Sequence, residues 1–190
     1  MPTIQDTLLT RAISGVLTGA QEGLLPLFTW TLGLPQRDLL HMIQHCFPEL
    51  DELKPGDDAD YERILQTVPQ DFHEMVSMLL AEPSAFDEQP ERAWLARAVA
   101  AASFGEQHLW EDLGLFGRED VSTLLAQYFP ALAQRNVRGM RWKRFLFHEL
   151  SLRLNRADTM PPGCAQCEEF ERCALTPAPT SERPTHHDER

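Results

Sequence analysis

Three cysteines lie close together near the carboxy-terminal end of this 190-residue chain, at Cys164, Cys167 and Cys173, while Cys46 stands far from them. Two residues separate Cys164 from Cys167, and a short turn at this spacing brings both sulfurs to one side of a metal ion or cluster. Thiolates select zinc, copper(I) or iron–sulfur clusters over calcium and magnesium. The spacing therefore predicts a thiolate metal site.

The number of clustered thiols leaves the kind of metal open. A structural zinc ion takes four tetrahedral ligands, so a fourth would have to come from Asp158, His148, Cys46, a tail histidine or a second chain. An iron–sulfur cluster can instead leave one metal corner without a cysteine, which suits a cluster that hands a metal on. Zinc and an iron–sulfur cluster both agree with three thiols.

The elements that position this segment are predicted to be helices. Leu and Ala together number 45, against 10 Val plus Ile, and no segment sustains an alternation of apolar and polar residues. We therefore expect an all-α fold, a bundle of antiparallel helices followed by the cysteine segment. The apolar spacing predicts helices at about 4–20, 35–48, 59–67, 70–82, 90–112, 117–128 and 130–154.

The chain divides into three predicted parts. Residues 1–158 form the helical domain, 159–173 the cysteine metal-binding segment, and 174–190 a proline-containing tail expected to be disordered. The first residues do not resemble a secretory signal, and the uncharged run at 23–36 is shorter than the roughly 20 residues of a membrane helix. We expect a cytoplasmic protein without a membrane span, whose clustered cysteines ligate metal.

Charge is divided unevenly along the chain, whose net charge is −12. Residues 49–91 hold 13 acidic and 2 basic residues, whereas 135–156 hold seven basic residues and one acid. So acidic a protein is not expected to bind nucleic acid or anionic membranes. We interpret the two segments as solvated helix faces that attract each other; alternatively, Arg141 and Arg144 attract an oxyanion beside the cysteines.

A weak internal repeat joins two parts of the chain. LGLPQRDLLHMIQHCFPEL at 32–50 resembles LGLFGREDVSTLLAQYFPAL at 113–132. Both begin with Leu-Gly-Leu and continue through an apolar helical stretch to Phe-Pro. The repeat predicts a helical hairpin used twice.

Several short sequence motifs in the second half of the chain resemble those of a known family. They are HLWEDLGL at 108–115, YFP at 128–130, Asn136, and MRWKRF at 140–145. In this order, and followed by the cysteine cluster, they resemble the NifQ family of nitrogen fixation proteins over roughly residues 100–173.

The resemblance implies an iron–sulfur protein that binds molybdenum and donates it to synthesis of the iron–molybdenum cofactor of nitrogenase, without being an enzyme. The implied partners are a molybdenum supplier, the nitrogenase reductase component and the cofactor scaffold. The family pattern is Cys-x4-Cys-x2-Cys-x5-Cys, and its last three members fall on Cys164, Cys167 and Cys173. Its first member falls on Thr159, so molybdenum in the fourth corner, or Asp158 as an oxygen ligand, would complete the cluster.

Two further side chains are not predicted to be ligands. His108, which lies in one of the family-like motifs, is expected at most to contact the ligands of the cluster, and Cys46 is interpreted as a buried structural thiol. No phosphate loop or catalytic motif is present, so enzymatic turnover is not expected. Two alternatives remain: a zinc-stabilised helical interaction module, and a divergent homologue without metal, which Thr159 favours.

Overall fold

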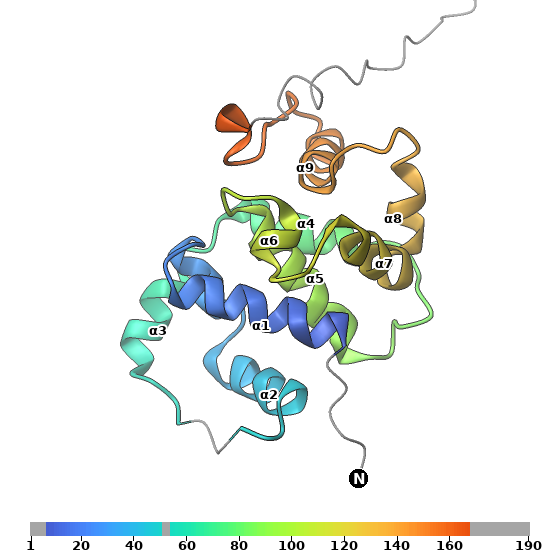
Figure 1. The fold of residues 1–190 in the computed structure, drawn as a ribbon. Coiled ribbons are helices and arrows are strands. Elements are labelled where there is room, and N and C mark those ends of the chain that lie inside the picture. Colours follow the sequence, from blue (N-terminus) through green and yellow to red (C-terminus); the bar gives the residue numbers. More distant parts are fainter. Residues whose placement is uncertain (1–6, 51–53, 168–190) are drawn as a thin grey trace, which may run out of the picture.

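The computed structural model describes residues 7–50 and 54–167 (Figure 1). Within these ranges every regular element is helical, which confirms the predicted all-α fold. In chain order the elements are α1 (Leu8–Gln21), the 3-10 turn η1 (Leu27–Thr31), α2 (Gln36–Cys46), α3 (Asp58–Leu65), α4 (Gln70–Leu80), α5 (Pro90–Ser103), α6 (Leu109–Asp112), α7 (Arg118–Tyr128), α8 (Pro130–Arg135), α9 (Trp142–Arg153) and the 3-10 turn η2 (Cys164–Gln166). Cys173 and the predicted tail lie outside the described residues.

The centre of the fold is α5, which contacts α1, α4 and α6. Every residue from Trp94 to Ser103 except Arg97 is buried, as expected of a helix that is surrounded by others. Most of these residues are alanines, whose small side chains let neighbouring helices approach while favouring helix formation. Arg97 donates from Nη1 to the carbonyl oxygens of Leu32 and Gly33, at 2.9 and 3.0 Å. The helix thereby also fixes the turn that follows η1.

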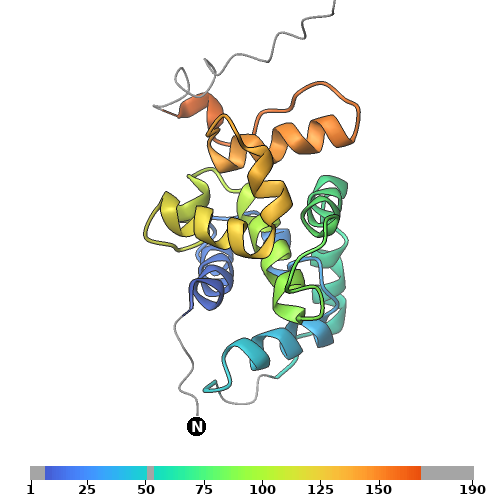
Figure 2. The ribbon, with the colours of Figure 1, turned by 90° about the vertical axis from the view of Figure 1, so that its right-hand side faces the viewer.

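The helices do not share one axis. In Figure 1, α1 lies across the view while α9 is seen nearly end-on, and Figure 2 shows α9 along its length. The predicted bundle of antiparallel helices is therefore not confirmed. None of the described helices is both long and apolar enough to cross a membrane.

The prediction of a single helix at 90–112 is wrong, because the chain turns between α5 and α6. The turn contains Gly105, where a Cβ atom would overlap the carboxylate of Asp112. Only a glycine lets the chain return this closely to α6. The break places the loop 105–108 beside the start of α9.

The prediction of a single helix at 130–154 is also wrong. The amide of Asn136 closes a turn between α8 and α9: its Nδ2 donates to the Met140 carbonyl at 2.9 Å, and its Oδ1 accepts from the Met140 N–H at 2.8 Å. An asparagine side chain that satisfies backbone groups in this way competes with helix continuation. Residues 136–141 therefore form a loop, and α9 begins only at Trp142.

The internal repeat has a structural counterpart at the ends of α2 and α7. Phe47 follows α2 with φ −136° and ψ 64°, and Phe129 follows α7 with φ −133° and ψ 54°. Each N–H donates to the carbonyl four residues earlier, at 2.8 and 2.9 Å. The helix and its end are thus repeated, but α7 leads directly into α8 whereas the next helix after α2 begins at Asp58. Among the described residues, therefore, a second helix directly follows the repeated helix only after α7.

Candidate metal centre

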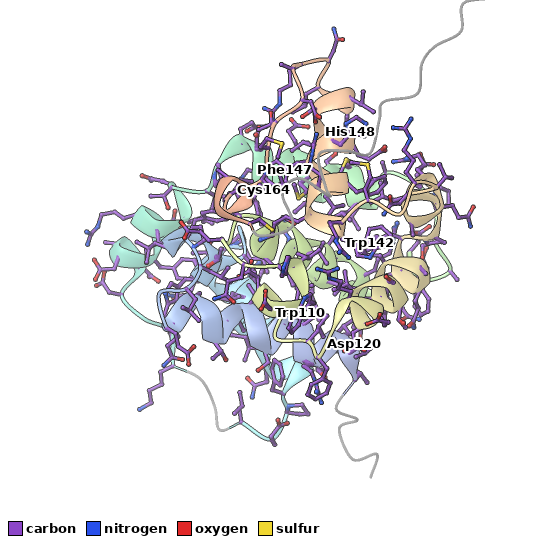
Figure 3. The ribbon with its side chains drawn as sticks, turned by 45° about the horizontal axis from the view of Figure 1, so that its top comes forward. Trp110, Asp120, Trp142, Phe147, His148 and Cys164 are labelled. Atoms are coloured by element: carbon purple, nitrogen blue, oxygen red, sulfur yellow. The ribbon has the colours of Figure 1, made fainter. Side chains whose placement is uncertain are left out.

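A cavity of about 810 Å³ is lined by residues 108–111, Asn136 and residues 140–144 of the family-like motifs, together with two cysteines. Its wall includes residues 106–111, Asn136, residues 139–144, and both Cys164 and Cys167. Trp110 from α6 and Trp142 from α9 lie on this wall with Cys164 (Figure 3). The loops 105–108 and 136–141, which interrupt the two predicted long helices, thus bring separate parts of the sequence to one cavity.

The two cysteines lie on one tight turn. The N–H of Cys167 donates to the Cys164 carbonyl at 3.2 Å, which closes η2. Gly163 enters the turn in the left-handed region, at φ 74°, and a Cβ atom there would overlap the Glu106 carbonyl. Both thiols are unbonded to another cysteine and half-buried. The turn therefore presents two sulfurs to one cavity while its glycine packs on the loop 105–108.

A buried ion pair fixes that loop. Lys143 donates from Nζ to Asp112 Oδ2 at 2.6 Å, to the Gly105 carbonyl at 3.0 Å, and to the Gln107 carbonyl. The side chains of Lys143 and Asp112 are 8% and 2% exposed. The three acceptors match the three N–H donors of an ammonium group. Lys143 thus joins α9 to the loop on which the cysteine turn packs.

Burial shifts the proton affinities of both partners. Burial lowers the pKa of Lys143, while the charges of Asp112 and Cys164 oppose this shift. Burial likewise raises the pKa of Asp112, and Lys143 opposes the change.

The proposed fourth ligands pair with each other. Arg144 donates to both oxygens of Asp158, to Oδ1 at 2.9 Å and also to Oδ2. His148 Nδ1 lies 3.4 Å from Asp158 Oδ1. The Arg144 hydrogen bonds hold the pKa of Asp158 below its ordinary value. Arg144 lines the cavity, but Asp158 and His148 are not part of its described wall.

The remaining predicted site residues divide between the wall of the cavity and the part of the chain outside the structure. His108 and Arg141 both line the cavity, and the His108 N–H donates to Glu111 Oε2 at 2.9 Å. Cys173 lies outside the described residues. Within 7–50 and 54–167, no three His, Cys, Asp or Glu side chains converge as metal ligands. The described residues therefore bring together two of the three predicted thiols.

Two residues of this site were missed by sequence reasoning. Arg118 lines the cavity from the first position of α7, and nothing in its spacing relates it to the cysteines. Lys143 did carry a signal, since it lies at helical spacing from the buried residues Phe147 and Leu150. A lysine on an apolar face needs a buried acidic partner.

Cys46 belongs to a different part of the fold, as expected of a structural thiol. It is buried on α2, and burial raises its pKa to about 12. On the same helix, His45 Nε2 lies 2.7 Å from Glu91 Oε1 and its ring lies 5.0 Å from that of Trp94. The histidine is thus engaged in packing α2 against α5.

Comparison with known proteins identifies the family. The family model described as NifQ matches residues 9–174. Protein NifQ of Azotobacter vinelandii is 36% identical over 149 residues, which are 75% of this chain and 76% of that protein. The Protein NifQ homolog of Sinorhizobium fredii (strain NBRC 101917 / NGR234) is 30% identical over 172 residues, 87% of this chain and 67% of that protein. Protein NifQ of Klebsiella pneumoniae is 31% identical over 154 residues, 71% of this chain and 92% of that protein.

No solved structure matches this fold. The family model spans both the helical body and the cysteine turn. Of the family-like motifs, residues 108–111, Asn136 and residues 140–144 line the cavity, whereas residues 128–130 do not. The chain therefore belongs to the NifQ family of nitrogen fixation proteins.

Proposed function

We propose that this chain is an iron–sulfur, molybdenum-binding protein that donates molybdenum for synthesis of the nitrogenase iron–molybdenum cofactor. The observation that supports this most is that Cys164 and Cys167 line the same cavity as residues 108–111, Asn136 and residues 140–144 of the family-like motifs. Molybdenum is then the cargo of the protein, and no substrate is converted.

The donor set fits a thiolate-bound cluster. Cys164 and Cys167 lie on one turn and are half-buried, so a cluster could contact both sulfurs and still be reached from outside. Cys173 would supply the third thiolate. When bound, the iron–sulfur cluster supplies the sulfide and iron atoms that hold molybdenum.

Molybdenum, the cargo, is proposed to occupy the fourth metal corner of the cluster. Thr159 occupies the place of the first family cysteine, and its N–H donates to Ser151 Oγ at 3.0 Å. Asp158 is bound by Arg144 and His148, so its carboxylate would have to leave two partners to become a ligand. Three thiolates and one exchangeable molybdenum corner require neither residue.

We propose that the protein acts in the reducing cytoplasm, where thiols stay available to metal. A molybdenum supplier would load it, and the nitrogenase reductase component and cofactor scaffold would receive the metal. These partners follow from family membership and are proposed on that ground.

Anaerobic purification of the full-length protein tests the function. We expect a coloured protein that contains iron, acid-labile sulfide and molybdenum, and loses all three when Cys164, Cys167 and Cys173 are replaced together by serine. A colourless protein with one zinc ion would contradict the proposal and favour the zinc-stabilised interaction module. In that case a chelator should unfold the carboxy-terminal segment without a change of colour.

A protein that contains no metal but keeps its partners after the triple replacement would instead be a divergent homologue acting only by binding. The two measurements together, metal content and partner binding, separate the three functions.

A further inference from the structure

We propose that the exposed face of η1, beside the acidic helix α3, is a docking surface for a partner protein whose own contact surface is apolar at its centre and basic around it. This face, here named the η1 ridge, consists of Leu24, Leu27 and Trp30. Docking on it would not depend on which metal the cysteine turn holds.

The ridge results from an alternation of exposed and buried side chains with a period of three residues. Leu24, Leu27 and Trp30 are 54%, 59% and 39% exposed. Leu25 and Phe28, which follow the two leucines, are only 5% and 6% exposed. A 3-10 helix has three residues per turn, so Leu27 and Trp30 lie on the same face of η1. Large apolar side chains that are exposed singly need no explanation, but three within residues 24–30 indicate an interaction surface.

The buried side of η1 holds the ridge in place. The Phe28 ring packs edge-on against the rings of Phe72 and Phe104, at centroid distances of 5.6 and 5.5 Å. Thr29 Oγ1 donates to the Pro26 carbonyl at 2.6 Å, which ties the side chain to the first turn of η1. A surface that is already ordered loses little conformational entropy when a partner binds. The ridge is therefore preorganised for docking.

The element beside the ridge is acidic. Helix α3 contacts η1, and Tyr61 of α3 donates from Oη to the Leu34 carbonyl at 2.8 Å. The segment 49–65, which ends in α3, carries seven acidic and two basic residues. Asp58 and Glu62 lie one turn apart on α3, and both are exposed. These carboxylates would attract positive charge on a docking partner.

The basic side chains on the elements around η1 do not reverse this charge. Arg63 is bound to Asp60 within α3, and Arg37 Nε lies 3.4 Å from Asp38 Oδ1. Arg97 donates to two backbone carbonyls in the turn after η1. Since the segment 49–65 alone has five more acidic than basic residues, the single charge of Arg97 leaves the neighbourhood negative.

This charge decides what kind of partner fits. Two copies of this chain paired through their ridges would bring two acidic α3 helices together, and like charges across an interface oppose association. The occupant is therefore a different protein surface, apolar where it covers Leu27 and Trp30 and basic where it faces α3.

The ridge also lies close to the loop that supports the cysteine turn. Leu24 lines a second cavity, of about 410 Å³, whose wall includes Gln107 and Glu111. The same two residues line the cavity of the candidate metal centre. A partner seated on the ridge would thus extend toward the loop 105–108.

The test titrates the full-length protein with a synthetic amphipathic helical peptide of leucine and lysine, and with the same peptide carrying glutamate in place of lysine. We expect saturable binding of the lysine peptide that weakens with salt, and no binding of the glutamate peptide. Leu27→Ser should weaken binding roughly tenfold or more. Glu62→Gln should weaken it roughly two- to fivefold.

Two exposed residues elsewhere on the surface provide matched controls. Leu152→Ser changes a leucine that is 63% exposed on α9. Glu88→Gln removes an exposed carboxylate from the loop between α4 and α5, which runs along the side of the molecule opposite α3 in Figure 1. Neither change should alter binding of the lysine peptide. The melting temperature of each variant confirms that it is folded.

Trp30 reports where the peptide binds. Binding on the ridge should shield Trp30 from acrylamide and shift its fluorescence to shorter wavelength, whereas Trp94 is already buried. Trp30→Phe should keep binding within about twofold and lose this change. Trp110 and Trp142 line the cavity of the candidate metal centre, so a signal that persists in Trp30→Phe would place the peptide there and overturn the inference.

Equal binding by the wild type and Leu27→Ser would also overturn it, as would an equal loss in Leu152→Ser. Equal effects of Glu62→Gln and Glu88→Gln, or binding of the glutamate peptide, would contradict the basic rim of the partner. Sedimentation of the protein alone completes the test. A dimer that dissociates in Leu27→Ser would show that the ridge binds a second copy of this chain instead.

Discussion

Lys143 holds its ammonium group where it is only 8% exposed, with Asp112 Oδ2 2.6 Å away. Removing one partner of such a pair leaves the other charge buried and unpaired, at a cost of about 3–5 kcal/mol. We therefore expect Lys143→Met to lower the free energy of unfolding in urea by about that amount. The double variant with Asp112→Leu should lose less than the sum of the two single changes, because neither charge is then left alone. Additive losses would mean that the two side chains do not interact.

Asp158 makes stability depend on pH through its bond to Arg144. The pKa of Asp158 in the folded protein lies below its ordinary value of about 3.9, so ionisation of this carboxyl stabilises the fold. That contribution is complete above the ordinary pKa and disappears as pH falls through the lower folded pKa. Because the Asp158 side chain is 42% exposed, the contribution is at most about 1 kcal/mol.

Asp158→Asn should therefore be less stable than the wild type at pH 7, and the difference should shrink below the ordinary pKa of the carboxyl and vanish once pH is below its lowered pKa in the folded protein. Urea unfolding across this range measures it, and an NMR titration of Asp158 in Arg144→Gln should show a raised pKa. A difference between wild type and variant that is constant with pH would contradict this assignment.

At the level of elements, local sequence rules predicted where most helices begin and end, and failed where a distant contact decides. Pro35 and Pro90 each mark the start of a helix as expected. The break at Gly105, in contrast, depends on a contact with Asp112 and on Lys143 from α9. Such a contact has no signature in a window of neighbouring residues. The spacing of the cysteines predicted a thiolate turn, and the prolines predicted helix starts, because both patterns lie within a few neighbouring residues.

The cysteine turn depends on Gly163 in two ways, its φ of 74° and its contact with the Glu106 backbone. Gly163→Ala should displace the turn from the loop 105–108 and raise the rate at which Cys164 reacts with an alkylating reagent. Gly23→Ala is the matched control, since Gly23 has φ 73° but open space around its Cβ position. The control carries the same backbone strain of about 1–2 kcal/mol without the overlap.

Mass spectrometry of the labelled peptides measures both rates. If Gly23→Ala accelerates labelling of Cys164 as much as Gly163→Ala does, then general destabilisation rather than displacement of the turn explains the effect.

Across the whole molecule, the acidic middle and the basic stretch meet. Arg156 donates to both oxygens of Asp71, at 2.9 and 2.6 Å, and Arg135 lies 3.6 Å from Glu82. These pairs join the segment that follows α9, and the end of α8, to the acidic region around α4, as the charge pattern predicted. The pattern could not reveal that part of the basic stretch lines a cavity, because this depends on the turn at Asn136 and on the position of α7.

The apolar core and the cysteine turn are separate parts of this molecule, which leads to a prediction about metal removal. The core of the described residues extends along the chain only to Leu154, and neither Cys164 nor Cys167 belongs to it. Serine at Cys164, Cys167 and Cys173 together should therefore change the free energy of unfolding of the helical body by less than about 1 kcal/mol, because substitutions outside a core usually change it by about 0.5 kcal/mol or less each.

Cys46→Ser is the matched control, because the same substitution then places a hydroxyl where the side chain is 5% exposed. This variant should lose about 1–3 kcal/mol unless the hydroxyl finds a partner. Circular dichroism during urea unfolding measures both. A large loss in the triple variant and none in Cys46→Ser would mean that metal at the cysteine turn holds the fold together, as in a zinc-stabilised module. A small loss means that the protein can release its metal and remain folded, which a molybdenum donor requires.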